Sequence, residues 1–299
     1  MTGATGFVGG ATMRKAVAAG WHVRALTRRP QAEYEGVTWI AGALDQPASL
    51  AEMAAGSDVV MHIAGVVNVP TRAAFEAGNA TATAHVIDAA RDAGVTRFVH
   101  VSSLAAREPG LSDYGWSKER AEIVVKDSGL DWTIVRPPAV FGPGDTEMLD
   151  LFRMVRRGVA LLPPSGRMSA IYVDELARLL VALAADRSAS IGQVYEPDDG
   201  KPAGWSHRSF ARAIGRAVGR AYVPTLAVPA AVLKAGGRID KLVRRGRAKL
   251  TPDRARYIAH PDWVATEGAC PPVGLWRPEL GTDDALAETV RWYRKEGWL

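Results

Sequence analysis

The chain has 299 residues, of which 47% are hydrophobic and 23% charged, a balance typical of one or two globular domains and not of a disordered segment. Its one cysteine, Cys270, excludes a disulfide framework within the chain and a multi-cysteine metal site. No apolar run approaches the ~20 residues that span a bilayer, and no basic segment followed by a long apolar one opens the chain. These features predict a cytoplasmic protein without a transmembrane segment.

The net charge of +5 is modest but unevenly distributed. Residues 201–260 contain fourteen basic residues against two acidic ones, Asp240 and Asp253. Such a region is compatible with a solvated surface, an anionic substrate, a membrane surface or nucleic acid. We favour the solvated surface first and an anionic small molecule next. We expect no nucleic acid as partner, because no nucleic-acid-binding motif accompanies the charge.

The first 140 residues alternate short apolar runs with alanine-rich amphipathic stretches. The apolar runs are rich in valine, isoleucine or aromatic residues and predict strands at 22–27, 37–40, 59–63, 98–102 and 132–135. The amphipathic stretches predict helices at 9–19, 48–55, 81–93 and 114–128. Regular alternation with nearly continuous apolar strands predicts an α/β fold, a doubly wound parallel sheet with helices on both faces.

Beyond residue 140 this alternation weakens. Helices are predicted at 148–157 and 173–185, a short strand at 193–196, a mostly helical and basic region at 205–250, and a closing helix at 283–296. We therefore predict a nucleotide-binding domain over residues 1–196, interleaved with substrate segments from about residue 140. A smaller, mostly helical substrate domain is predicted over residues 197–299.

Glycines near the N-terminus form the pattern GxxGxxG where a strand should turn into a helix. Glycine lets a pyrophosphate approach the backbone, and the helix N-terminus supplies unpaired N–H groups and a partial positive charge. The pattern therefore predicts a dinucleotide phosphate site. Its residues are Gly3, Gly6, Phe7, Val8 and Gly9.

The strand that should precede Gly3 is missing, because the chain starts at Met1. In a doubly wound sheet that strand is central, and its loss would leave two unpaired strand edges. We expect the natural product to begin about five to eight residues upstream, since a strand is typically ~5 residues long.

The ribose end of such a cofactor is bound about 20 residues past the glycines, after the second strand. Arg28 and Arg29 occupy that position, and the first acidic residue after them is Glu33. A carboxylate there would favour NAD, whereas guanidinium groups suit a 2′-phosphate. We therefore predict NADP as the preferred cofactor, with NAD as the alternative. Arginines after a strand are also common on ordinary surfaces.

Ser102 and Ser103 follow a predicted strand, and Tyr114 and Lys118 lie four apart on one face of a predicted helix. A tyrosine with its ordinary pKa of about 10 is a poor acid–base group at neutral pH, but a neighbouring ammonium favours its phenolate. A serine hydroxyl beside it can bond a substrate oxygen and stabilise developing charge. The combination predicts proton transfer at a carbonyl or alcohol group.

Taken together, these motifs resemble the extended short-chain dehydrogenases/reductases, which include NAD-dependent epimerases, dehydratases and 3β-hydroxysteroid-dehydrogenase-like reductases. The matching segments run along almost the whole chain: TGATGFVG at 2–9, HIAG at 62–65, NATAT at 79–83, VSS at 101–103, YGWSK at 114–118, RPPAVFGP at 136–143 and YVDE at 172–175. The resemblance implies a Rossmann fold and an NAD(P)-dependent oxidoreductase or epimerase that moves a hydride to or from a carbonyl or alcohol carbon.

The resemblance also implies residue roles. Tyr114 would be the acid–base residue, Lys118 would bind the nicotinamide ribose, and Ser103 would hold the substrate oxygen, with Ser102 as the alternative. Asn79 would belong to the supporting proton or water network. For the cofactor, the resemblance places Ala64 near the adenosine ribose and Pro137 beside the nicotinamide.

No metal site is predicted, because the six histidines show no HxH or HExxH spacing. His62 and His100 lie within predicted strands and are expected to be packing residues. The expected partner is a small-molecule substrate, an anionic one being compatible with the basic region, and a homodimer is left open. Two other functions are also left open: a dinucleotide-binding assembly or regulatory protein without turnover, and a membrane-surface or polyanion binder through residues 201–260.

Overall fold

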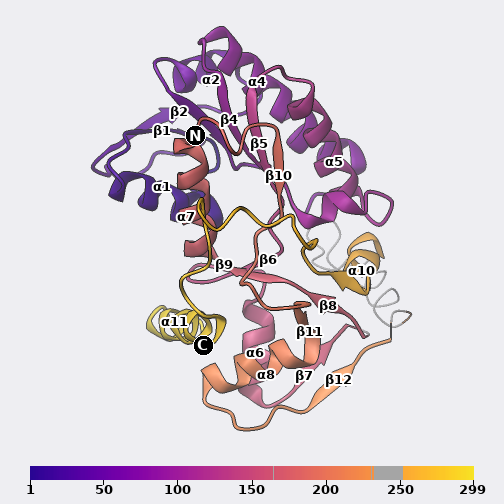
Figure 1. The fold of residues 1–299 in the computed structure, drawn as a ribbon. Coiled ribbons are helices and arrows are strands. Elements are labelled where there is room, and N and C mark those ends of the chain that lie inside the picture. The colour runs from indigo at the N-terminus through magenta and orange to yellow at the C-terminus, as the bar shows by residue number, and fades with distance from the viewer. Residues whose placement is uncertain (164, 230, 232–251) are drawn as a thin grey trace. The chain divides into compact units, whose positions relative to one another are not determined.

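The computed structural model describes residues 1–163, 165–229, 231 and 252–299. The chain divides into two compact units, whose elements are labelled in Figure 1. The first comprises Met1–Pro137, Leu176–Glu196 and Pro271–Trp276, and the second comprises Pro138–Glu175, Pro197–Cys270 and Arg277–Leu299. The chain thus first enters the second unit at residue 138 and crosses between the units several times.

Parallel strands build the sheet of the first unit, and each contains an apolar run predicted from the sequence. β10, β5, β4 and β3 are hydrogen-bonded in that order, and β1 pairs with β2. Every residue of β4 is buried, as expected for a strand covered on both faces. The bounds are β1 (Val23–Thr27), β2 (Val37–Ala41), β3 (Val59–His62), β4 (Arg97–Val101), β5 (Asp131–Val135) and β10 (Gln193–Tyr195).

The first two residues lie between β1 and β3. Thr2 forms a parallel bridge with His62, and its N–H donates to the Met61 carbonyl at 3.0 Å. On the other side, the Leu26 N–H donates to the Met1 carbonyl at 3.1 Å. The order across the sheet is therefore β2, β1, residues 1–2, β3, β4, β5 and β10, so that the glycine loop leaves from the centre. This confirms the predicted doubly wound α/β fold; a start upstream of Met1 stays a prediction.

Helices cover this sheet on both faces. Apolar residues of α2, α4 and α5 form one buried cluster with the strands, including Leu50, Val86 and Val125 around Phe98. α1 and the part of α7 in this unit lie on the other side of the strands (Figure 1). The bounds are α1 (Phe7–Ala18), α2 (Pro47–Ala54), α3 (Arg72–Phe75), the π-helical η1 (Glu76–Thr81), α4 (Ala82–Asp92), the 3-10 turn η2 (Leu104–Arg107), α5 (Asp113–Lys126) and α7 (Val173–Ala185).

The second unit combines helices with short strands. Its core is aromatic, with Phe141, Phe152, Phe210 and Tyr293 almost completely buried. β6 pairs with β9, β7 with β12, and β8 with both β11 and β13. The bounds are β6 (Ala139–Phe141), α6 (Leu149–Arg157), β7 (Ala160–Leu162), β8 (Arg167–Met168), β9 (Ala170–Tyr172), β11 (Trp205–Ser206), α8 (His207–Val218), β12 (Thr225–Ala227), α10 (Pro252–Ile258), β13 (Asp262–Trp263) and α11 (Thr282–Lys295).

Of the basic region predicted to be mostly helical over 205–250, the structure describes residues 205–229 and 231, and in this part α8 covers residues 207–218. α8 ends at Gly219, which has the left-handed conformation that glycine favours, and the chain then runs through the extended β12. Residues 230 and 232–251 of this prediction lie outside the described residues. In the part of the chain that the structure describes, no helix has the length and apolar character needed to span a membrane.

Candidate active site

The glycine loop connects residues 1–2, at the centre of the sheet, to α1. Gly3 has a φ of 77°, and a Cβ there would lie 2.7 Å from the Ala64 nitrogen. A Cβ on Gly9 would lie 2.0 Å from the Gly3 carbonyl oxygen, so both positions require glycine. Gly6 is exposed and directly precedes α1, whose leading N–H groups have no intrahelical acceptor. This helix start suits the charge of a pyrophosphate.

The other residues predicted for the dinucleotide flank this loop. Phe7 and Val8 are half-buried and begin α1. Arg28 and Arg29 are exposed directly after β1, where the Thr27 hydroxyl donates to the Arg29 carbonyl at 2.7 Å and closes a short turn. Neither arginine has an ion-pair partner among the described residues. Both guanidinium groups can therefore donate hydrogen bonds to a bound phosphate.

Asn79, in the π-helical η1, clamps the loop after β3 to α5. Its Oδ1 accepts from the Val66 N–H at 2.8 Å, and its Nδ2 donates to the Val66 carbonyl at 3.0 Å and the Ser117 hydroxyl at 2.8 Å. A Cβ on Gly65 would lie 2.9 Å from this Oδ1, and the half-buried Ala64 directly precedes that glycine. Both amide protons of Asn79 are thus used inside the protein, and its part in a proton network stays a prediction.

Lys118 lies in the interior of the site, with 5% of its surface exposed. Its ammonium group donates to the Val101 carbonyl at 2.9 Å, at the end of β4. Burial lowers the pKa of Lys118 to about 8, and the negative charge of Glu122, one turn further along α5, opposes that lowering. An ammonium group that is still charged at neutral pH therefore belongs to the residue one helical turn after Tyr114.

The start of α5 lies close to the turn η2. Ser112 caps the helix by accepting from the Gly115 N–H at 3.0 Å. A Cβ on Gly115 would lie 2.5 Å from the Ala105 carbonyl oxygen in η2, so any other residue would push the helix away from this turn. Because Ser103 caps η2 and Tyr114 is in the first turn of α5, Gly115 sets the spacing between these two residues.

The two candidate serines have different surroundings. Ser102 is buried, and its hydroxyl donates to the Glu122 carboxylate at 2.6 Å. Ser103 is half-buried and accepts from the Ala105 N–H at 3.2 Å, which leaves its own proton for another acceptor. The carbonyl of the buried Pro137 accepts from the first N–H of η2 at 3.1 Å and fixes this turn to the end of β5.

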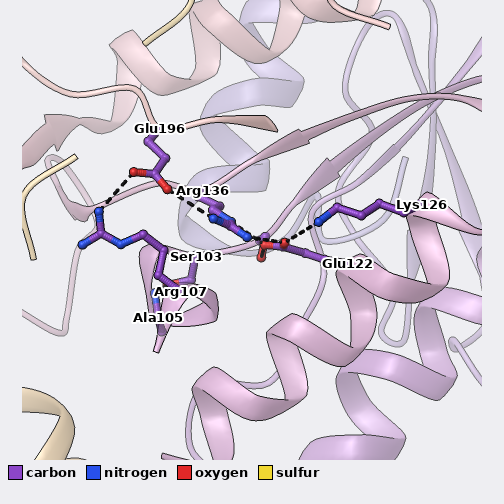
Figure 2. A network of polar contacts seen from close by, with 8 residues as sticks. Ser103, Ala105, Arg107, Glu122, Lys126, Arg136 and Glu196 are labelled. Atoms are coloured by element: carbon purple, nitrogen blue, oxygen red, sulfur yellow. Dashed lines mark hydrogen bonds and ion pairs between the residues drawn. The ribbon is translucent and has the colours of Figure 1, made fainter. Parts of the chain in front are cut away.

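An ionic network of the first unit is formed by Arg107, Glu122, Arg136 and Glu196 (Figure 2). Arg136 donates to the two carboxylate oxygens of Glu122 at 2.8 and 2.7 Å, and to Glu196 at 3.3 Å. Arg107 donates to the other oxygen of Glu196 at 3.2 Å. The Glu122 and Glu196 side chains are 1% and 4% exposed, so both charges depend on these partners.

The ionic network ties four separate segments of the first unit together. Glu122 belongs to α5, Arg107 to η2, and Arg136 and Glu196 directly follow β5 and β10. Burial disfavours the charge of Arg136, but the hydrogen bonds and charges of the two carboxylates outweigh this effect and raise its pKa. The network therefore holds the helix with Tyr114 and the turn capped by a serine against the carboxyl ends of the strands.

His62 of β3 and His100 of β4 stack on each other, with ring centroids 5.4 Å apart. His62 Nδ1 lies 2.7 Å from the Thr2 hydroxyl and its Nε2 lies 3.0 Å from the Thr83 hydroxyl, whereas neither nitrogen of His100 has a hydrogen-bond partner among the described residues. Burial, assisted by the charge of Lys118, lowers the pKa of His62 to about 3 and that of His100 well below its usual range. Both rings are neutral at physiological pH.

Comparison with known proteins places this site in a family. A family model described as NAD(P)H-binding matches residues 3–187, and ceramide reductase of Caulobacter vibrioides is 35% identical over 311 residues, covering 100% of this chain and 95% of that relative. The chain belongs to the extended short-chain dehydrogenase/reductase family. A 2-alkyl-3-oxoalkanoate reductase of Stenotrophomonas maltophilia is 27% identical over 96% of both chains. The human epimerase family protein SDR39U1, solved with NADPH, has a TM-score of 0.73 at 20% identity, covering 97% of this chain and 98% of that one.

As a member of the extended short-chain dehydrogenases/reductases, the protein is an NAD(P)-dependent reductase or epimerase. The exposed Gly6 before α1 and the crowded Gly3 and Gly9 form a cradle that fits the dinucleotide. α5 and the segments bound to it bring Asn79, the serine turn, Tyr114 and Lys118 together in the first unit.

Sequence reasoning missed several residues that build this site. Gly115 was not singled out, although a glycine between Tyr114 and Lys118 is visible in the sequence. Glu122 stands four residues after Lys118, which is a usable signal for a carboxylate on the same helix face. Glu196 had no signal in the sequence, because sixty residues separate it from its partner Arg136.

Proposed function

We propose that the protein is an NADPH-dependent reductase that converts the oxo group of a long-chain lipid into a hydroxyl group. The full-length similarity to ceramide reductase carries this proposal. The 2-alkyl-3-oxoalkanoate reductase, matched over 96% of both chains, supports it, because its name describes an oxo group beside an alkyl chain. Reduction is favoured over epimerisation because these two relatives are both named as reductases.

In the proposed reaction, the nicotinamide supplies a hydride to the carbonyl carbon when it is bound. Tyr114 donates its phenolic proton to the carbonyl oxygen, and Ser103 stabilises the charge on that oxygen with its hydroxyl proton. Lys118 binds the nicotinamide ribose and keeps a positive charge one turn from the phenolate that forms. Net addition of one hydride and one proton yields the alcohol.

Preference for NADPH rests on Arg28 and Arg29 in this proposal. Both side chains are exposed directly after β1 and have no ion-pair partner among the described residues. Guanidinium groups form bidentate bonds to a 2′-phosphate. The ribose of NAD would find no carboxylate before Glu33 to accept from its 2′-hydroxyl.

The test measures NADPH consumption with an oxo-ceramide analogue, a 2-alkyl-3-oxoalkanoate and UDP-glucose as separate substrates. We expect consumption with an oxo-lipid, equimolar formation of the hydroxy product, and no reaction with UDP-glucose. In Tyr114→Phe the turnover number should fall by roughly 10²–10⁴-fold with NADPH binding retained, since the ring remains and the transferable proton is lost.

Tyr34→Phe is the matched control, because it removes an exposed phenol at a position without a proposed role. Near wild-type turnover in Tyr114→Phe would refute the acid–base assignment. Interconversion of a UDP-sugar without net loss of NADPH would refute the proposed reduction. Tight NADPH binding with no turnover of any substrate would favour a regulatory role.

A further inference from the structure

The second unit contains two long segments without acidic residues. Residues 151–173 hold four arginines and no aspartate or glutamate. Residues 200–229 hold four arginines and one lysine, again with no acidic residue. Mixed charges are the norm on protein surfaces, so two carboxylate-free segments in one unit concentrate positive potential wherever they meet.

These segments meet where β7 pairs with β12, and Figure 1 shows the two strands beside each other. Leu161 of β7 lies opposite Leu226 of β12, and these side chains are 49% and 58% exposed. The neighbours of Leu161 on β7 are buried, so the strand presents its inner face to the core and its outer face to solvent. Tyr222, shortly before β12, is 72% exposed. The outer face of this strand pair is therefore apolar.

Arginines border this apolar surface. Arg156 and Arg157 are exposed in the last turn of α6, which ends at Gly158 in the left-handed conformation and leads into β7. Arg220 is exposed as well, and its Nε donates to the Arg156 carbonyl at 2.8 Å. Two of these arginines border a hollow of about 460 Å³, which is lined by Arg156, Val218, Gly219, Arg220, Ala221 and Tyr222.

The bordering arginines differ from the neighbouring ones in their partners. Arg153 on α6 pairs with Asp150, and Arg216 on α8 pairs with Asp283. Among the described residues, no carboxylate pairs with Arg156, Arg157 or Arg220. Their charge is not neutralised within the described part of the protein. We name the surface formed by Leu161, Tyr222, Leu226 and these three arginines the Leu161 face.

We propose that the Leu161 face docks on the surface of a bilayer rich in anionic phospholipids. Stable attachment to a bilayer surface needs two signals together, apolar side chains that enter the headgroup boundary and basic side chains that bind anionic headgroups. The Leu161 face supplies both within one compact unit. Arginine in particular binds phosphate through paired N–H donors, and an exposed tyrosine suits the boundary between water and acyl chains. This inference requires no catalytic turnover.

The test measures cosedimentation of the whole protein with phosphatidylcholine vesicles, with and without phosphatidylglycerol. We expect binding only when phosphatidylglycerol is present, and loss of that binding at high salt. Arg157→Glu should weaken partitioning by roughly tenfold or more, because it replaces an attractive charge with a repulsive one. Leu226→Ser should also weaken it, since it removes an apolar group from the headgroup boundary.

Arg120→Glu is the matched control, because it makes the same change in net charge at an exposed position of α5 in the first unit. This variant should keep most of the binding. Thermal unfolding and NADPH binding, measured for every variant, show that each remains folded. Equal losses in Arg120→Glu and Arg157→Glu would overturn the proposal, because they would reveal a response to net charge alone. Unchanged binding in Leu226→Ser, with equal binding to soluble heparin, would also overturn it.

Discussion

Arginines of the two units illustrate opposite uses of the same side chain. In the first unit, Arg136 is 18% exposed and its guanidinium group contacts two buried carboxylates. In the second unit, Arg156 and Arg157 are exposed and have no carboxylate partner among the described residues. A buried ion depends on its partner, whereas an exposed guanidinium group remains available to an anion outside the chain. Thus the placement of carboxylates, and not arginine content, distinguishes internal support from a binding surface.

The largest effect is expected from removing the interior arginine of the first unit. Arg136→Met should lower the free energy of unfolding by about 3–5 kcal/mol, because Glu122 and Glu196 stay buried without their shared partner. Urea denaturation of the wild type and the variant measures this difference. Adding Glu122→Gln to the variant should recover part of the loss, since one uncompensated charge is removed. If the double variant lost as much free energy of unfolding as the two single variants together, the carboxylates would not depend on this arginine.

The sequence was sufficient for the sheet of the first unit and insufficient for the finer structure of the site. Continuous apolar runs predicted β1 to β5 within a residue or two, because burial on both faces leaves a strong local signal. The choice between Ser102 and Ser103 left no such signal, since it depends on a hydrogen bond to Glu122 twenty residues away. β7 and β12 were not predicted, because each has three residues, too few for an alternation to appear, although the equally short β10 was predicted.

The buried ring of His62 predicts how the free energy of unfolding varies with pH. His62 has a pKa of about 3 in the folded protein, because burial and then the charge of Lys118 lower it. An unfolded histidine has a pKa of about 6.5, so between those values the unfolded state binds an extra proton and stability falls as pH falls. At about pH 4.5 the loss from His62 alone is about 2–3 kcal/mol.

Denaturation midpoints measured between neutral and acid pH test this expectation. His62→Gln keeps a polar side chain near Thr2 and Thr83 but cannot take up the proton. Its free energy of unfolding should therefore vary less with pH than that of the wild type. Parallel pH profiles for the two proteins would assign the acid sensitivity to other groups.

Arg28 is an exposed arginine for which we propose a ligand, the 2′-phosphate of NADPH. Arg28→Asp should weaken NADPH binding about tenfold or more, which corresponds to about 1.4 kcal/mol or more, and shift the preference toward NADH. Fluorescence titration at one ionic strength measures both affinities. Arg91→Asp is a control, because this arginine lies in the last turn of α4 and contacts the Ser128 carbonyl. Equal NADPH affinity in Arg28→Asp and the wild type would leave the cofactor preference without this explanation.

The smallest effect is expected at the Glu122 carboxylate, which an exposed lysine and an interior arginine both contact. Lys126 lies 3.6 Å from Glu122 with a side chain that is 41% exposed, whereas Arg136 approaches the same carboxylate at 2.7 Å from the interior. Water screens the exposed pair, so Lys126→Ala should cost about 0–1 kcal/mol against the several kcal/mol expected for the arginine. Urea denaturation under identical conditions compares the two variants directly. Equal losses in the two variants would mean that solvent does not screen the lysine. Burial of the cation would then not explain why Glu122 depends more on Arg136 than on Lys126.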